Sequence, residues 1–235
     1  MGQMSPFEHP DPDLVHASVI APHGHQASLA VGLAFINTQE VQRGRVIEHL
    51  PTIEIALRWL RGHQLLHQEA LEAGLLSSAA APSTGDRALV RIHRVRAAMR
   101  ELADATVEHR PPEGRHLDRI NRSLRTPYSY ILVPAADGVS MDHRHEGDPV
   151  EGAMARLVES LAREVSQGHP DRIRVCANEE CRWVFHDTSR SGRRKWCDMS
   201  TCGNRAKVAR HREKRRANTG EAASEVPEAA EPAAG

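Results

Sequence analysis

The chain has 235 residues, of which 40% are hydrophobic but only 3% aromatic, so its core must come mainly from Leu, Val, Ile and Ala. Its 31 basic and 31 acidic residues cancel. No apolar run reaches the length of a membrane span, and the N-terminus has neither the basic start nor the apolar stretch of a signal peptide. These features exclude a membrane protein, predict a cytoplasmic location and make a disulfide framework unexpected.

Helical patterns dominate the first half of the chain. Residues 1–26 are rich in His and Pro, lack periodicity and are predicted to be a flexible segment. A buried helix is expected from Leu29, a second after Pro51-Thr52, and a long third helix behind the N-cap candidate Asp86. Small residues and Pro over 77–85 predict a loop.

The pattern changes after a shorter predicted helix over 117–124. Residues 128–133 have the composition of a strand, and residues 139–142 can return as its hairpin partner after a turn. Asp148-Pro149 then begins another helix, with Asp as the N-cap and Pro in the first turn. The predicted fold class of this part is therefore mainly α with a small β-hairpin (α+β).

All four cysteines of the chain lie in its last third, with the spacing C-x4-C-x15-C-x4-C. They are Cys176, Cys181, Cys197 and Cys202. Two pairs of equal spacing around a short connector can supply four thiolates to one metal ion, and Zn²⁺ favours such a tetrahedral set. The sequence therefore predicts one structural zinc ion. An iron–sulfur cluster is the main chemical alternative, and a redox dithiol is disfavoured because that motif is C-x-x-C.

The features around the cysteines follow the order of a treble-clef zinc finger. Residues 182–185 are predicted to be a first strand, Lys195-Trp196 the approach to a second, and a helix without breakers follows Gly203. The positive end of that helix would stabilise the thiolate of Cys202. Because so small a unit buries little apolar surface, it should need the metal in order to fold.

The zero net charge hides a strong asymmetry. Residues 172–216 contain 14 Lys or Arg against 5 Asp or Glu, residues 1–171 contain 17 against 22, and residues 217–235 contain four Glu and no basic residue. A basic module beside an acidic body is typical of nucleic-acid binding. The predicted nucleic-acid contacts lie in the turn before Cys197 and in the helix after Cys202: Arg193, Arg194, Lys195, Arg205, Lys207, Arg210 and Arg212.

Two questions about the basic helix stay open at this point. Its basic side chains form two stripes: Arg205, Arg212 and Arg216 on one side, and Lys207, Arg210 and Lys214 on the other. The sequence does not decide which stripe would face bases. Asn204 could bond a base edge, but a role in capping or in orienting a thiolate is favoured.

The last third resembles the CGNR zinc finger family. The resemblance is carried by the following residues: Arg174, Cys176, Cys181, Phe185, Asp187, Ser189-Arg190, Arg193-Arg194, Trp196-Cys197, Met199, Cys202-Gly203-Asn204-Arg205, Lys207, Arg210 and Arg212. Members of this family carry an N-terminal ABATE domain, associated with stress-induced transcription regulation, and residues 28–168 resemble it more loosely, through residues 33–38, Leu102 and Asn121. The acidic residue usual in the first of these motifs is absent, and Gly32-Leu33-Ala34 stands there. The resemblance implies a DNA-binding bacterial regulator.

The predicted organisation has four parts. They are a flexible segment (1–26), an ABATE-like mainly helical domain (27–168), a CGNR-type zinc finger of treble-clef-like fold (172–216) and a disordered Ala/Glu/Pro tail (217–235).

The predicted function is a zinc-containing, DNA-binding transcription regulator that is cytoplasmic and associated with the nucleoid. The chain is not predicted to be an enzyme, because it contains no nucleophile elbow, phosphate loop or metalloprotease motif. An RNA-binding module is one alternative, in which Trp183 or Trp196 would stack on bases. A zinc-dependent protein-interaction adaptor is another, and the sequence leaves a homodimer open.

Overall fold

The fold is taken from a computed structural model, which describes residues 27–222 except 43, 67, 69, 74–80, 136–137 and 146. The segment 1–26, predicted to be flexible, lies outside the described residues, as do residues 223–235 of the predicted tail. The chain forms two compact units, the first ending at Cys197 and the second beginning at Asp198. None of the described helices combines the length and the apolarity that crossing a bilayer requires.

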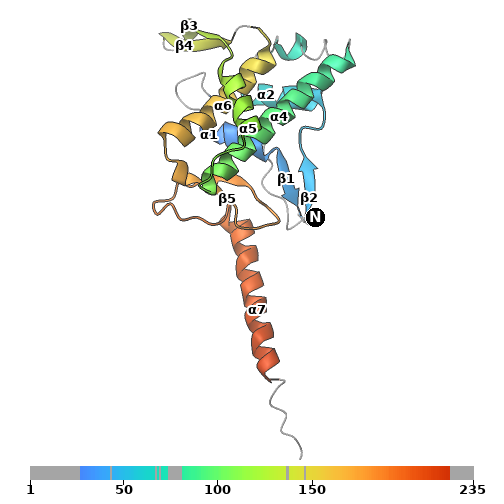
Figure 1. The fold of residues 1–235 in the computed structure, drawn as a ribbon, viewed down its shortest axis with the longest axis vertical. Coiled ribbons are helices and arrows are strands. Elements are labelled where there is room, and N and C mark those ends of the chain that lie inside the picture. Colours follow the sequence, from blue (N-terminus) through green and yellow to red (C-terminus); the bar gives the residue numbers. More distant parts are fainter. Residues whose placement is uncertain are drawn as a thin grey trace, which may run out of the picture. The chain divides into compact units, whose positions relative to one another are not determined.

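The first unit is mostly helical with three two-stranded antiparallel hairpins in its described part (Figure 1). Its main helices are α1 (Leu29–Asn37), α2 (Ile53–Gly62), α4 (Pro82–Val107), α5 (Gly114–Leu124) and α6 (Pro149–Gln167). Its hairpins are β1 (Gln39–Gln42) with β2 (Arg45–Glu48), β3 (Tyr128–Ala135) with β4 (Gly138–His145), and β5 (Ile173–Val175) with β6 (Val184–His186). The short 3₁₀ helix η1 (Pro170–Arg172) connects α6 to β5.

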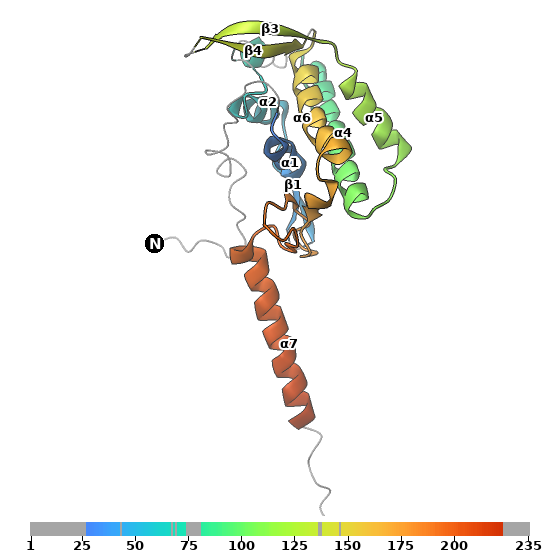
Figure 2. The same cartoon turned by 90° about the vertical axis from the view of Figure 1, so that its left-hand side faces the viewer.

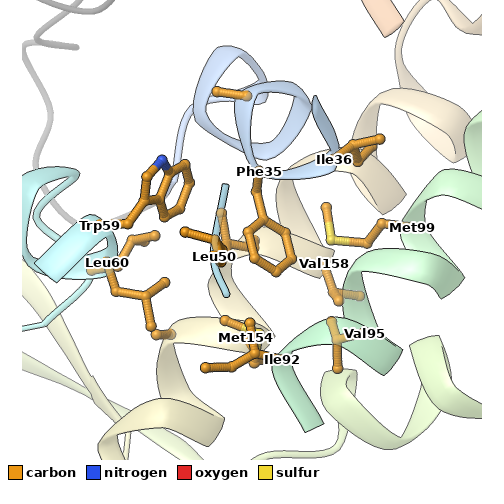
Figure 3. Packing of buried hydrophobic residues seen from close by; sticks show 14 of the residues in the cluster. Phe35, Ile36, Leu50, Trp59, Leu60, Ile92, Val95, Met99, Met154 and Val158 are labelled. Atoms are coloured by element: carbon orange, nitrogen blue, oxygen red, sulfur yellow. The ribbon is translucent and has the colours of Figure 1, made fainter. Parts of the chain in front are cut away.

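Helix α1 is at the centre of the hydrophobic core. Six of its nine residues, from Gly32 to Asn37, are buried, and Ser28 caps its start by accepting a hydrogen bond from the Val31 N–H. Phe35 is fully enclosed among Trp59 of α2, Met99 of α4 and other apolar side chains (Figure 3). A helix that is apolar on nearly all sides has to be covered on all sides, and the longer helices α4 and α6 provide that cover.

Two features of the first half differ from the sequence prediction. Helix α4 begins at Pro82 and not at Asp86, so the end of the predicted loop is helical. Proline in the first turn needs no N–H and is already fixed at a helical φ, which favours this earlier start. The hairpin β1–β2 was not predicted, because its strands have only four residues each and no clear apolar alternation.

The hairpin predicted around residues 128–142 is confirmed, and both of its strands are longer than expected. Cross-strand partners such as Leu132 and Met141 share one face of the two-stranded sheet. That face carries Tyr130, Leu132, Val139 and Met141, which are all well exposed. Figure 2 shows the hairpin at one end of α6.

The second unit consists of a short turn and one long helix. The π-helical turn η2 (Met199–Gly203) is capped by the Asp198 carboxylate, which accepts a hydrogen bond from the Thr201 N–H. Helix α7 (Asn204–Ala222) follows directly and continues beyond Arg216, where the predicted finger ended. Most of the α7 side chains that the structure describes are exposed, including that of Val208. The described part of the second unit therefore has no apolar core of its own.

Candidate metal centre and nucleic-acid interface

The first cysteine pair lies at the turn of the hairpin β5–β6. Cys176 follows β5 directly, and Cys181 comes three residues before β6. The strand predicted over 182–185 overlaps β6, but the second strand predicted at Lys195-Trp196 was wrong. The actual partner of β6 is β5, and Lys195 only accepts a backbone hydrogen bond from the Ala177 N–H at 2.8 Å. A three-residue strand before the first cysteine is too short to give a sequence signal.

The structure brings all four cysteine sulfurs together. The Sγ atoms of Cys176, Cys181, Cys197 and Cys202 all lie within 4.8 Å of one another. Cys181 and Cys197 are 3.7 Å apart at sulfur, which is far longer than a disulfide bond. Four sulfurs bound tetrahedrally at about 2.3 Å from a zinc ion would be ~3.8 Å apart, so this spacing fits Zn²⁺.

The donor set also fits a structural role for the ion. Cys176, Cys181 and Cys202 are buried, and Cys197 is partly buried. Four thiolates complete the tetrahedral coordination of Zn²⁺ and leave no position open for a substrate. When bound, zinc would hold these four sulfurs as thiolates and thereby connect the β5–β6 hairpin to Cys197 and Cys202. The chain thus has one structural zinc site.

A buried carboxylate holds the loop between β6 and Cys197. Asp187 accepts hydrogen bonds from the backbone N–H groups of Ser189 at 2.9 Å and Arg194 at 2.8 Å. Burial alone would raise the pKa of Asp187, but the hydrogen bonds from Ser189 and Arg194 outweigh burial and lower the pKa to about 2. These contacts are those of a turn residue.

Arginine side chains also hold the loop between β6 and Cys197, by donating hydrogen bonds to its backbone carbonyl groups. Arg172 donates to the carbonyl oxygen of Ser189 at 2.6 Å, and Arg174 donates to that of Gly192 at 2.6 Å. The Arg194 guanidinium lies 5.1 Å from the centre of the Phe185 ring and donates to the Cys197 carbonyl. Arg194, one of the predicted nucleic-acid contacts, therefore also has a structural role.

The finger strand β6 is bonded to α1 by a side chain that sequence reasoning did not connect to the finger. The Asn37 amide donates to the Val184 carbonyl at 2.8 Å and accepts from the Val184 N–H at 2.9 Å. Ile173 and Val184 belong to the same hydrophobic core as the helices. Nothing in the local sequence marks this contact, because the partner lies 147 residues away.

The other predicted nucleic-acid contacts have different surroundings. Arg193 and Lys195 are exposed in the loop before Cys197, and Arg205 is partly buried at the start of α7. Lys207, Arg210 and Arg212 are exposed on α7, and no ion pair involves them among the residues that the structure describes. Asn204 donates from its amide to the Ser200 carbonyl at 2.9 Å, so its side chain bonds the preceding turn η2. Trp183 and Trp196 are both half-buried.

The mostly helical first unit and the four-cysteine site define this chain as a zinc-finger protein. The family model for the CGNR zinc finger matches residues 172–215. The family model ABATE, which carries the description "Putative stress-induced transcription regulator", matches residues 29–168. The chain belongs to the ABATE family. A comparison with curated proteins gave no match.

Proposed function

We propose that this chain is a DNA-binding transcription regulator in which zinc folds a treble-clef-like finger and helix α7 contacts DNA. The observation that carries the proposal is α7 itself. It contains seven Lys or Arg and two Glu among 19 residues, and its basic side chains are exposed over most of their positions. A helix that is polar all round gains little from packing, so exposed charges such as those of Lys207, Arg210 and Arg212 are available for a partner.

The zinc site supports this proposal because it fixes the start of the basic helix. Cys202 belongs to η2, and α7 begins two residues later. Hairpin, ligand turn and helix in this order are what a treble-clef finger requires. Phosphate contacts from Lys207, Arg210 and Arg212 would supply affinity, and base contacts would come from whichever stripe of α7 enters a groove. The proposal assigns the chain no catalytic step.

DNA binding can be tested by fluorescence anisotropy with a random-sequence duplex over a salt series. Replacing Lys207, Arg210 and Arg212 with Gln should weaken binding and reduce the salt slope by roughly 0.9 for each phosphate that is no longer neutralised. The matched control replaces three exposed arginines of α2 and α5, Arg58, Arg61 and Arg115, by the same change. If both variants bind DNA equally weakly, the loss comes from the lower net charge of the protein, and the role of α7 is contradicted.

The same assay distinguishes the two alternatives. Tighter binding of single-stranded RNA than of duplex DNA would replace the proposal by an RNA-binding function, in which Trp183 or Trp196 stacks on bases. Failure to bind either nucleic acid would favour a protein-interaction finger. The homodimer stays a prediction, to be checked by sedimentation of the zinc-loaded protein.

A further inference from the structure

Five arginines surround one cavity in the helical part of the first unit. The cavity has a volume of about 580 Å³ and lies between α4, α5 and α6, which run side by side in Figure 2. The arginines come from α4 and α5: Arg87, Arg91, Arg94, Arg119 and Arg122. The volume is typical of pockets that bind small molecules.

Among the residues that the structure describes, carboxylates pair with one of these five arginines, Arg91. Arg91 donates to the carboxylates of Asp148 at 2.8 Å and Glu151 at 2.6 Å. Within the part of the chain that the structure describes, the guanidinium groups of the other four arginines form no ion pair. Asp86 and Glu151 are the acidic residues of the lining, and Glu151 is already bound to Arg91.

The arginines also repel one another. Burial is the main cause that lowers the pKa of Arg119, and the charges of Arg94 and Arg122 lower it further. Like charges held together without a counter-charge cost folding stability. Sites that keep such an arrangement are typically sites of function.

Apolar and hydroxyl groups complete the lining. Met154 and Val95 are buried at the wall of the cavity, whereas Val90 is 44% exposed. Ser123 and Thr126 add hydroxyl groups near the end of α5. A ligand that fits this lining carries negative charge at one end and an apolar group at the other.

We propose that this cavity binds a small organic dianion, such as a phosphate monoester with an apolar group. The planar guanidinium of arginine donates paired hydrogen bonds to phosphate or carboxylate oxygens. A dianion matches four unneutralised guanidinium groups better than a monoanion does. The site lies outside the zinc finger, so it adds a small-molecule ligand to the proposed DNA-binding function and does not depend on it.

Calorimetric titration of the full zinc-loaded chain at fixed ionic strength tests the proposal. Phenyl phosphate should bind with a Kd at least about tenfold below that of benzoate, and neutral benzamide should show no saturable binding. Inorganic phosphate should bind more weakly than phenyl phosphate, because it lacks the apolar group. Equal affinity for all four probes, or saturable binding of none, would overturn the proposal.

Variants locate the binding. Arg119→Gln and Arg94→Gln should each raise the Kd for phenyl phosphate about tenfold, and Val90→Glu, which adds a carboxylate to the lining, should do the same. Arg115→Gln is the matched control, since Arg115 lies on α5 but is 77% exposed and pairs with Glu113. An unchanged Kd in the three lining variants, or the same increase in the control, would contradict the site.

Two further measurements distinguish a ligand site from a structural role of the arginines and from DNA binding. Thermal unfolding of unliganded Arg119→Gln should give a melting temperature equal to or above that of the original protein, because repulsion is relieved. A lower melting temperature would show that Arg119 supports the fold and would argue against a ligand site. The second measurement tests whether duplex DNA displaces phenyl phosphate from a variant in which the charges of α7 are neutralised. Displacement from that variant would show that the cavity arginines bind the DNA backbone and not a small ligand.

Discussion

Asn37 shows how one side chain can hold two distant segments together. Its amide pairs with both the N–H and the carbonyl of Val184, as a neighbouring strand would. All of these groups are buried. A buried backbone group without a partner costs about 1–3 kcal/mol. The main contribution of Asn37 is therefore that it prevents this cost at Val184.

Asn37→Ala should therefore lower the free energy of unfolding by about 2–4 kcal/mol, since two buried backbone groups would be left without partners. Guanidinium unfolding followed by circular dichroism measures the change. Asn121→Ala, which alters an exposed Asn on α5, is the control and should change stability little. A decrease below about 0.5 kcal/mol for Asn37→Ala would mean that water replaces the amide.

Glu48 is the acidic partner of a buried arginine. The Arg96 side chain is 3% exposed and donates to both Glu48 carboxylate oxygens and to the Thr38 hydroxyl. Burial would raise the pKa of Glu48, but the hydrogen bond from Arg96, a backbone hydrogen bond from Leu50 and the charge of Arg96 lower it below its usual value. A lowered pKa in the folded state means that ionised Glu48 stabilises the fold.

This contribution is fully present above the pKa of Glu48 in the unfolded chain, about 4.3, and is lost as the pH falls through the folded value. Glu48→Gln should lower stability at pH 7 by about 1–3 kcal/mol and flatten its decline below about pH 5. Unfolding curves from pH 7 to 3 measure both effects. Glu113→Gln, at an exposed pair, should leave the pH profile unchanged; the same flattening there would contradict the assignment.

At the residue scale, the sequence predicted those groups whose chemistry is carried by spacing alone. The four cysteines are such a case, because the pairs Cys176/Cys181 and Cys197/Cys202 are local and zinc restricts how they combine. The structural role of Arg194 was not predictable in the same way. It depends on the position of the Phe185 ring, which the fold and not the local sequence determines.

At the scale of elements, the close approach of α1 and α6 depends on a missing side chain. A Cβ atom added at Gly32 would lie 2.3 Å from the Ser160 Oγ, which itself donates to the Leu157 carbonyl at 2.7 Å. In this chain the position serves helix packing.

In Gly32→Ala, overpacking should lower the free energy of unfolding by about 1–3 kcal/mol. The higher helix propensity of Ala should offset about 1 kcal/mol of this loss. Adding Ser160→Ala removes the clashing oxygen, so the double variant should be more stable than Gly32→Ala alone. Thermal unfolding of both single variants and the double variant gives the coupling energy. Gly62→Ala is the control, because nothing lies within 4 Å of a Cβ there. Additive effects of the two substitutions would show that Ser160 simply rotates away.

Helices with long apolar patterns were predictable, and short strands were not. Helices α1, α2, α5 and α6 follow the expected segments, because ten or so residues of helical periodicity give a strong signal. The hairpins β1–β2 and β5–β6 have strands of three or four residues. In the second hairpin, β5 packs on α4 and β6 packs on α1. Tertiary packing of this kind is invisible to a local pattern.

At the scale of the whole molecule, the first half of the zinc finger is part of the helical core. Ile173 and Val184, on the strands that flank the first cysteine pair, pack with the residues around Phe35. Asn37 adds hydrogen bonds to the same strand. The finger sequence and the helical sequence match two separate family models, yet the finger strands β5 and β6 share one core with the helices.

Removal of zinc should consequently destabilise the helices as well as the finger. A ligand that binds only the folded state adds about 4 kcal/mol to the free energy of unfolding at a free concentration about 1,000-fold above its Kd. For a chain of this size, this corresponds to a shift of the melting temperature by roughly 8–16 °C.

The purified protein should hold one zinc per chain by elemental analysis. Chelation, or Cys181→Ser, should lower the melting temperature recorded by far-ultraviolet circular dichroism, which reports the helices. Tryptophan fluorescence, which reports Trp183 and Trp196 together with Trp59, should shift over the same temperatures. Re-addition of zinc should restore the chelated protein but not Cys181→Ser. If the helical transition stays in place while only the fluorescence changes, the finger and the helices unfold separately, and the shared core does not couple them.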